Sequence, residues 1–363
     1  MKILFVTNLP SPYRVDFFNE LGKLSDLTVF YERSSASDRD QKWKGNVAAT
    51  YTERYIKLKP LGTDRSIGLG LVKAIKKQKF DVLILSGYAS PSVMFAIAYC
   101  KRKKIPYYIE SDGGFCKKDR FPKSLLKKFL LSKAKGHFVT CEEYKNYLLT
   151  LGVEESRIHK YPFTSLKSED ILLKTVSAEE KKRLREKLSM SEEKIVLAVG
   201  QFINRKGFDV LIRATEKLSS DVGVYFVGGV PTEAYVALKK ESGLNNIHFV
   251  GFKTKEELKE YYKTADLFVL PTREDIWGLV INEAMACGLP IVTTNKCIAG
   301  LELVKSGENG YLVEKDDPDE LADRIKDIIE NEEVCSKMGE KSLAVIGDYT
   351  VENMAKKHIS FFE

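Results

Sequence analysis

The stretch PTREDIWGLVINEAMACGLPIVTT, residues 271–294, decides the fold of this chain. It follows Leu267–Leu270, a short apolar run with the length and composition of a buried strand. Its middle predicts a helix over residues 278–287, which ends at the glycine and proline that follow. The apolar run at 291–293 then predicts another strand. This order places a helix N-terminus at the carboxyl end of a parallel strand.

Short runs rich in β-branched and aromatic residues alternate with amphipathic segments over the rest of the chain. Such alternation predicts an α/β fold with parallel sheets. Continuous apolar runs such as IVLAV indicate strands that are buried on both faces. Strands are expected at Ile3–Thr7, Asp26–Tyr31, Val82–Ser86, Tyr107–Ile109 and His137–Thr140, and in a second series at Ile195–Val199, Gly223–Val227, Ile247–Val250, Leu267–Leu270, Ile291–Thr293 and Tyr311–Val313.

The two series of strands indicate two domains, which the length of 363 residues also favours. Residues 164–194 separate the series, contain no strand-like run, and carry an expected helix near 178–188. We therefore expect two Rossmann-like domains facing across a cleft, at residues 1–165 and 170–345. A last helix at 350–362 is expected to pack back on the first domain.

The charge of the chain is unevenly distributed. The net charge is +7, yet residues 1–170 hold 31 Lys and Arg against 18 Asp and Glu, so the remainder is net acidic. A basic half suits an anionic surface or a substrate that bears phosphate. No apolar run approaches the ~18 residues that span a bilayer. The N-terminal apolar run is too short for a signal peptide, so we expect a cytoplasmic protein.

The sequence gives little support for a metal or covalent-nucleophile site. None of the six cysteines forms a C-x-x-C pair, and the four histidines are scattered, so we expect neither a metal cluster nor a disulfide framework. D-x-D patterns at 38–40 and 317–319 are the alternative metal candidates. The glycine-rich fingerprints of dinucleotide and triphosphate loops are absent, and so is the G-x-S-x-G elbow.

The helix that begins at Gly278 supplies an anion pocket, because free N–H groups and the helix dipole favour negative charge there. Gly278 has no side chain to block a phosphate. Asp275 precedes this helix and Glu283 lies within it. Their carboxylates can accept hydrogen bonds from sugar hydroxyls on either side of a diphosphate.

A second basic loop lies in residues 197–214, LAVGQFINRKGFDVLIRA. A strand ends at Gly200, and Arg205 and Lys206 stand where the following helix begins. Such side chains can neutralise the charge that grows on a departing diphosphate. The alternative is an ordinary solvated pair beside a helix.

Taken in order, these pieces make residues 195–322 resemble the donor domain of glycosyltransferase family 4, the retaining GT-B transferases. The segments that carry the resemblance are VGQFINRKGFDVLIRA, FVGGVP, FVGF (249–252), YKTADLFVLPT (262–272), the 271–294 stretch and GENGYLV (307–313). The first half is similar to members that build bacterial polysaccharides, through TNLPSPYRVDFFNEL, LILSGYASPSVM, IPYYIESDGG and KYPFTSL.

The resemblance assigns roles to individual residues. Glu283 matches the second glutamate of the family's paired-glutamate motif, which holds the nucleotide ribose. The first glutamate, which contacts the transferred sugar, falls on Asp275. Lys206 matches the residue that grips the diphosphate, and Arg205 takes the place of an arginine that is Gln201 here. The catalytic set is thus Asp275, Arg205 and Lys206, and the nucleotide site is Glu283, Gly278, Leu279, Val280, Gly200 and Phe252.

The resemblance also implies an activity. A hexose would move from a nucleotide-diphosphate sugar of UDP or GDP type to a saccharide or lipid-linked acceptor, with retention and without metal or other cofactor. Two departures concern the first domain: Pro10–Arg14 replaces the family's glycine pair, and Ser111 replaces a histidine before Asp112. The alternatives are an inactive protein that binds a sugar nucleotide and an epimerase of the same architecture. No feature indicates a nucleic-acid partner.

The basic segment 121–135, FPKSLLKKFLLSKAK, allows two interpretations. Its large apolar residues lie at helical spacing on one face, and the lysines lie mostly off that face. The segment is either a domain helix packed on its sheet or a surface that rests on anionic lipid. The second interpretation predicts peripheral contact with the inner face of a membrane. The apolar residues are Phe121, Leu125, Leu126 and Phe129, and the lysines are Lys123, Lys127 and Lys128.

Overall fold

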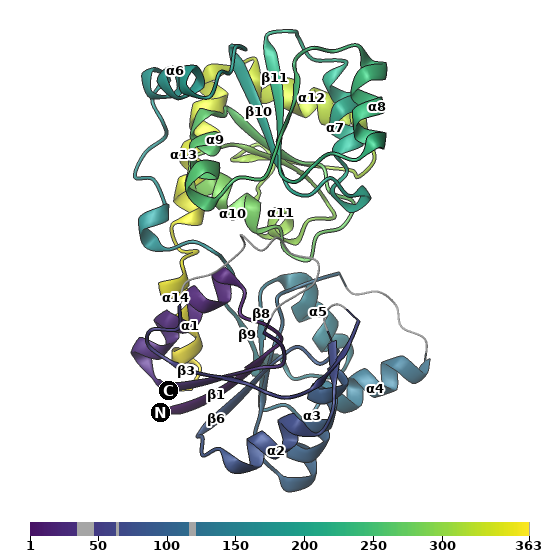
Figure 1. Ribbon diagram of the computed structural model, residues 1–363, viewed down its shortest axis with the longest axis vertical. Helices are drawn as coiled ribbons and strands as arrows, with labels where there is room; N and C mark the ends of the chain where they lie inside the picture. Colours follow the sequence, from purple (N-terminus) through teal and green to yellow (C-terminus); the bar gives the residue numbers. More distant parts are fainter. Residues whose placement is uncertain (35–46, 63–64, 116–120, 363) are drawn as a thin grey trace. The chain divides into compact units, whose positions relative to one another are not determined.

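The computed structural model describes residues 1–34, 47–62, 65–115 and 121–362. The chain divides into two compact units (Figure 1). Unit 1 consists of Met1–Ser165 and Thr350–Glu363, and unit 2 of Leu166–Tyr349. Among the described residues, no helix combines the length and the apolar character that crossing a membrane requires.

Unit 1 is built on a seven-stranded sheet in which every neighbouring pair is parallel. Its strands, in sheet order, are β3 (Thr52–Tyr55), β2 (Asp26–Tyr31), β1 (Lys2–Thr7), β6 (Val82–Ser86), β7 (Tyr108–Glu110), β8 (Gly136–Val139) and β9 (Ile158–Lys160). A separate antiparallel hairpin joins β4 (Lys59–Leu61) and β5 (Arg65–Ile67).

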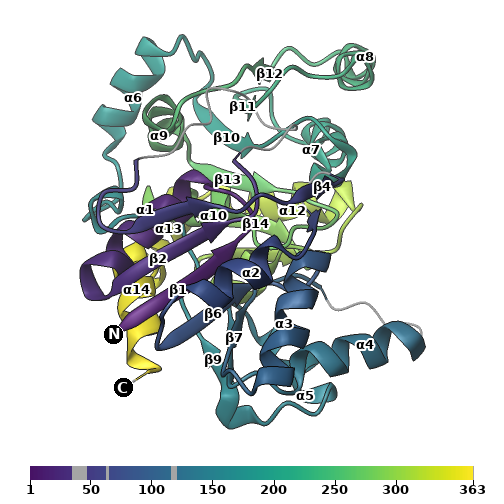
Figure 2. The same cartoon turned by 60° about the horizontal axis from the view of Figure 1, so that its bottom comes forward.

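Helices cover both faces of this sheet (Figures 1 and 2). On one face α1 (Pro12–Leu24) packs against α14 (Val351–Ser360), the last helix of the chain. The other face carries α2 (Gly70–Lys77), α3 (Pro91–Lys103), α4 (Phe121–Leu131) and α5 (Glu142–Thr150). Five of the six residues of β1 are buried, as the two covering layers require.

Unit 2 contains a six-stranded parallel sheet. Its strands, in sheet order, are β12 (Ile247–Val250), β11 (Val222–Val227), β10 (Lys194–Val199), β13 (Leu267–Leu270), β14 (Ile291–Thr294) and β15 (Gly310–Val313). The helices are α6 (Ala178–Lys187), α7 (Phe208–Thr215), α8 (Glu233–Ser242), α9 (Lys255–Thr264), α10 (Leu279–Ala286), α11 (Ile298–Leu303), α12 (Pro318–Ile329) and α13 (Glu332–Ile346).

Local signals in the sequence place several helix starts in unit 2. Thr254 and Glu257 form a reciprocal capping box at α9, which satisfies two N–H groups at once. Asp317 caps α12, and Pro318 takes the first helical position, where its missing N–H costs nothing. The predicted helix at 278–287 is confirmed as α10, with Gly278 as its N-cap.

The two parallel sheets with helices on their faces confirm the predicted α/β class. All six predicted strands of unit 2 are present. In unit 1 the prediction omitted β3, β9 and the β4–β5 hairpin. β3 is exposed along its whole length and no residue of β9 is buried, so neither shows the apolar pattern on which the prediction relied. Pairing with β2 and β8, not local composition, makes these edge segments strands.

Candidate functional site

Two loops of unit 2 meet because the strands before them are neighbours. β10 and β13 pair in parallel, so both chains leave the sheet at the same edge. After β10 the chain forms a short 3-10 turn, Asn204–Lys206, and enters α7. After β13 it passes through residues 271–278 and enters α10. Open α/β sheets bind ligands at this edge.

The meeting of these loops brings the three predicted catalytic residues together. The Lys206 Nζ atom lies 2.6 Å from Asp275 Oδ2. Arg205 Nη1 lies 3.2 Å from the same oxygen. The side chains of Lys206 and Asp275 are each 12% exposed, while that of Arg205 is 45% exposed. One carboxylate faces two cations, so the cluster keeps an excess positive charge with which an anion can interact.

Further hydrogen bonds hold the two loops in register. The Thr272 hydroxyl and the Arg273 N–H both donate to the Arg205 carbonyl, each at 2.8 Å. The Arg273 guanidinium pairs with Asp209 at 2.6 Å on the α7 side. The Asp275 N–H donates to the Lys296 carbonyl at 2.8 Å. Arg273 therefore positions the loop that carries Asp275, a role that the sequence analysis did not assign.

The predicted glycines lie in the same loops, and the structure adds a packing role for each. Gly278 has φ +102°, which favours glycine, and a Cβ there would stand 2.7 Å from Cys297 Sγ. A Cβ at Gly200 would stand 3.2 Å from Lys206 Cε. Glycine at position 200 thus lets the Lys206 side chain lie across the end of β10. Leu279 and Val280 form the first turn of α10, where backbone N–H groups have no partner within the helix.

Glu283 is oriented by a tyrosine on the neighbouring helix. The Tyr262 hydroxyl, from α9, donates to Glu283 Oε2 at 3.0 Å. Burial raises the pKa of Tyr262 well above its usual value, and the charge of Glu283 raises it further. The phenol therefore stays protonated and acts as a hydrogen-bond donor. The sequence analysis missed Tyr262, although it lies in the segment 262–272 that carries part of the resemblance.

Phe252 lies just beyond β12 and is 42% exposed. β12 is two strands away from β10 in the sheet. Asp275 thus forms ion pairs with both Arg205 and Lys206. Glu283 is held by the hydrogen bond from Tyr262. Phe252 follows β12, a more distant strand, at the same edge of the sheet.

The candidate metal motif at 317–319 does not add to this site. The Asp317 carboxylate accepts from the N–H groups of Asp319 and Glu320, at 3.0 and 2.9 Å, so it is engaged as a helix cap. The pattern at 38–40 lies outside the described residues. Within the described ranges, no group of three or more His, Cys, Asp or Glu side chains is placed to hold a metal ion.

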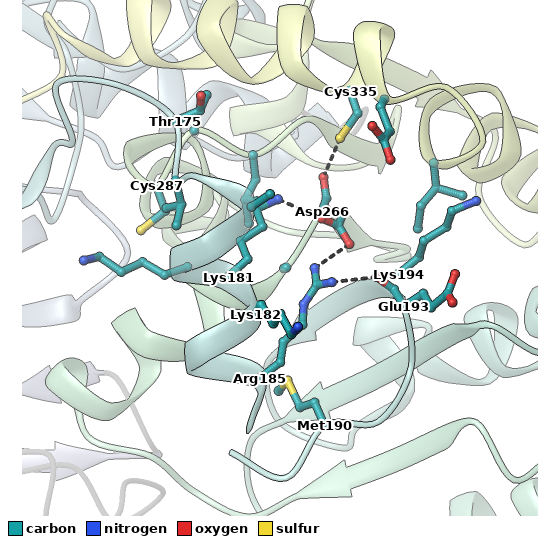
Figure 3. A pocket seen from close by; sticks show the side chains of 18 of the residues that line it. Thr175, Lys181, Lys182, Arg185, Met190, Glu193, Lys194, Asp266, Cys287 and Cys335 are labelled. Carbon is teal, nitrogen blue, oxygen red and sulfur yellow. Dashed lines mark hydrogen bonds and ion pairs between the residues drawn. The ribbon is translucent and has the colours of Figure 1, made fainter. Parts of the chain in front are cut away.

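A pocket of about 630 Å³ opens at the opposite edge of the same sheet (Figure 3). Asp266, which precedes β13, lies at its centre and pairs with Lys181 and Arg185 of α6, each at 2.7 Å. The same carboxylate accepts from the Ile195 N–H at 2.8 Å. These bonds attach α6 to the amino ends of β10 and β13. We interpret this pocket as structural, because its central charges already serve that attachment.

Comparison with known protein sequences gives a family match and two curated relatives that each cover about half of this chain or less. Residues 180–344 match the family model described as glycosyl transferases group 1. An uncharacterized glycosyltransferase of Methanocaldococcus jannaschii is 33% identical over 147 residues, which are 40% of each chain. The alpha-galactosylglucosyldiacylglycerol synthase of Streptococcus pneumoniae is 30% identical over 191 residues, 51% of this chain and 50% of the synthase. This chain therefore spans half or less of the length of both relatives.

The similarity in fold to solved structures extends over the whole chain. The crystal structure of Anabaena HepE in complex with UDP aligns with a TM-score of 0.81 and 17% identity, over 100% of this chain and 99% of that one. At this identity the likeness shows the fold alone. It confirms the predicted two-domain, Rossmann-like architecture, and the match of residues 180–344 confirms the predicted resemblance.

Proposed function

We propose that this protein is a retaining, metal-independent glycosyltransferase, because residues 180–344 match the family model of the glycosyl transferases group 1. It moves a hexose from a UDP- or GDP-sugar to a saccharide or lipid-linked acceptor, in the biosynthesis of a surface polysaccharide. The observation that carries the proposal is the cluster of Lys206 and Arg205, in the loop before α7, with Asp275, in the loop before α10. The UDP bound to HepE, a protein of the same fold, supports a nucleotide-sugar donor.

In the proposed reaction, negative charge develops on the leaving diphosphate, next to the positive charges of Lys206 and Arg205. The bond between the anomeric carbon and the diphosphate oxygen breaks, and its electron pair stays on the leaving diphosphate. Lys206 and Arg205 stabilise that charge together with the first turn of α10. The acceptor oxygen bonds to the anomeric carbon on the face that the diphosphate leaves. Its proton passes to an oxygen of the departing phosphate, so no separate basic side chain is required.

The carboxylates serve the neutral parts of the donor. Asp275 accepts a hydrogen bond from the transferred sugar while it keeps Lys206 in place. Glu283 accepts a hydrogen bond from Tyr262, and we propose that its carboxylate binds the vicinal ribose hydroxyls. A carboxylate binds neutral hydroxyls better than it binds a phosphate, since two anions repel each other.

Labelled UDP-, GDP- and ADP-sugars test this proposal. A thermal-shift screen identifies the base and sugar, because a ligand that binds only the folded state raises its stability. Incubation with the selected donor then separates the alternatives. Transfer or slow hydrolysis supports the transferase, isomerisation of the sugar supports the epimerase, and binding without turnover supports an inactive binding protein.

The structure also favours a membrane surface for α4. If α4 packed its apolar face on the sheet, Phe121, Leu125 and Phe129 would be buried, but their exposed fractions are 76%, 51% and 51%. Leu126 on the same helix is 44% exposed. Exposed apolar surface on one element marks a contact site. We therefore prefer the lipid interpretation of this segment.

The charges around α4 indicate which lipid surface it fits. Residues 121–135 contain five lysines and no acidic residue. Lys101 of α3 adds a further cation, whose Nζ lies 3.4 Å from the Phe129 ring centroid. Apolar side chains flanked by lysines match an anionic bilayer surface. We propose peripheral attachment of unit 1 to such a surface, which brings a lipid-linked acceptor close to the enzyme. The lipid product named for the pneumococcal relative supports this choice.

A further inference from the structure

Arg273, two positions before Asp275, joins three loops at the carboxyl edge of the unit 2 sheet. Its guanidinium forms two parallel bonds with Asp209 in the first turn of α7, Nη1 to Oδ1 at 2.9 Å and Nη2 to Oδ2 at 2.6 Å. Its Nε donates to Asp316, in the loop after β15, at 2.6 Å. Nη1 also donates to the Asn204 carbonyl at 2.7 Å. All three nitrogens of this side chain thus bind neighbouring loops.

The exposure of these groups indicates what the ion pairs contribute. The side chain of Arg273 is 21% exposed, and those of Asp209 and Asp316 are 32% and 44% exposed. The hydrogen bond to Asp209 raises the pKa of Arg273 against the effect of burial, so the guanidinium stays charged. Isolated ion pairs with such exposure add little to stability. The planar fork of arginine instead fixes the direction of its partners, which an ammonium group cannot do.

The same side chain holds the turn that carries both cations of the site. Asn204 opens the 3-10 turn whose other residues are Arg205 and Lys206. The Arg273 N–H donates to the Arg205 carbonyl at 2.8 Å, next to the bond from its guanidinium to Asn204. This turn and the loop of Asp275 are therefore connected twice. Arg273 makes one connection, and the ion pair between Lys206 and Asp275 makes the other.

The connection through Arg273 matters in the proposed reaction, in which Lys206 stabilises the leaving diphosphate. The Lys206 Nζ atom lies 2.6 Å from Asp275 Oδ2. An ammonium group that turns toward a diphosphate gives up part of its contact with this carboxylate, because the two anions repel each other and lie apart. If that ion pair were the sole connection, the two loops would then separate. A displacement of about 1 Å in a catalytic group can cost roughly 100-fold in rate.

We propose that Arg273 is a positioning residue for sugar transfer, which keeps the loops of Lys206 and Asp275 together while Lys206 exchanges its carboxylate partner for the leaving diphosphate. The inference rests on the sugar transfer proposed above and adds a residue to it. Asp209 and Asp316 already bind the guanidinium. Arg273 therefore acts through the two loops and not as a further cation for the phosphates.

Arg273→Lys in the full chain keeps the charge and removes the fork. With the nucleotide sugar that the screen selects, kcat should fall roughly 10- to 100-fold, because Lys206 and Asp275 lose their relative position. Affinity for the free nucleotide, measured by calorimetry, should change by less than about threefold, since the charge that Lys206 stabilises grows in the transition state. A residue that only stabilises the fold would lower the unfolding temperature and leave kcat of the folded enzyme unchanged.

The matched control is Arg324→Lys on α12, where the arginine pairs with Asp327 at 2.8 Å and both side chains are exposed. It should keep the parent's kcat. A folded Arg273→Lys variant with the parent's kcat overturns the inference, and so does an equal fall of kcat in the control. If Arg273→Lys does not fold, Asp209→Asn tests the same connection from the side of α7, with the same expected fall and the same refuting result.

A double-mutant cycle tests whether Arg273 acts through Lys206. Once Lys206→Gln has removed the cation, adding Arg273→Lys should lower kcat by less than about twofold. A full additive loss would show that Arg273 acts on another group, which overturns the proposed role. Failure of the transferase proposal looks different, because the parent itself would then turn over no nucleotide sugar. An active parent with unaffected variants refutes the role of Arg273 alone.

Discussion

Charge reversal on α4 should release unit 1 from anionic vesicles. The change is Lys123→Glu, Lys127→Glu and Lys128→Glu together. Each basic residue near an anionic surface contributes ~1 kcal/mol to attachment, so the loss of the three attractions weakens binding by roughly 3 kcal/mol. Since 1.4 kcal/mol corresponds to a factor of ten, the partition coefficient should fall by at least about 100-fold.

The apolar side chains of α4 make a second contribution to the free energy of membrane binding, which can be measured separately from that of the lysines. Full burial of a Leu or Phe side chain contributes about 1.5–3 kcal/mol. Leu125 and Phe129 each have an exposed fraction of 51% in the free protein, so about half of that remains to be gained in a membrane. Leu125→Ser with Phe129→Ser should therefore weaken binding by roughly 2 kcal/mol in total. This loss should depend little on salt, unlike the effect of the lysines.

The assay is co-sedimentation with vesicles that contain an anionic phospholipid, with neutral vesicles in parallel. Binding of the parent should be measurable at low salt and fall sharply near 1 M salt, where the Debye length is only about 3 Å. The matched control reverses the exposed Lys182, Arg183 and Lys187 on α6 of unit 2, which changes the net charge equally. Equal binding to neutral and anionic vesicles, absence of binding to both, or an equal loss in the control would refute the reasoning.

Four further predictions concern the site and the buried charges. Glu283→Ala should weaken binding of the selected nucleotide by about 10-fold or more, because a charged hydrogen-bond partner of the ribose is lost; unchanged affinity in calorimetry would contradict its role. Asp275→Asn should reduce turnover while the nucleotide still binds, measured by comparing kcat with nucleotide affinity. Activity should survive EDTA, because Lys206, Arg205 and the start of α10 provide the positive charge; complete loss that Mn²⁺ restores would contradict this. In unit 1, burial alone would raise the pKa of Glu110, but its buried ion pair with Arg14 and the nearby His358 lower it from 4.5 to about 2. The ionised form of Glu110 therefore adds stability that is present above pH 4.5 and is lost as the pH falls toward 2. Acid unfolding followed by circular dichroism should therefore be less steep in this range for Arg14→Met/Glu110→Met than for the parent, and an unchanged slope would count against the ion pair.

The sequence by itself determined the fold class and most of the sheet in unit 2. Strands such as β10 and β13 are continuous apolar runs, and the glycine and proline after α10 end that helix wherever the unit folds. These signals are local, so they need no knowledge of partners. The segments that escaped prediction, β3 and β9, are edge strands without such a pattern, and only their pairing defines them.

The contacts of the site were decided by the tertiary structure. Lys206 and Asp275 are 69 residues apart, and their ion pair follows from the adjacency of β10 and β13, which no local pattern encodes. The same holds for Tyr262 and Glu283, which meet because α9 and α10 pack together. The helical spacing of 121–135 was legible in the sequence, but the exposure of its apolar face was not, because periodicity shows which residues share a face and not what covers it.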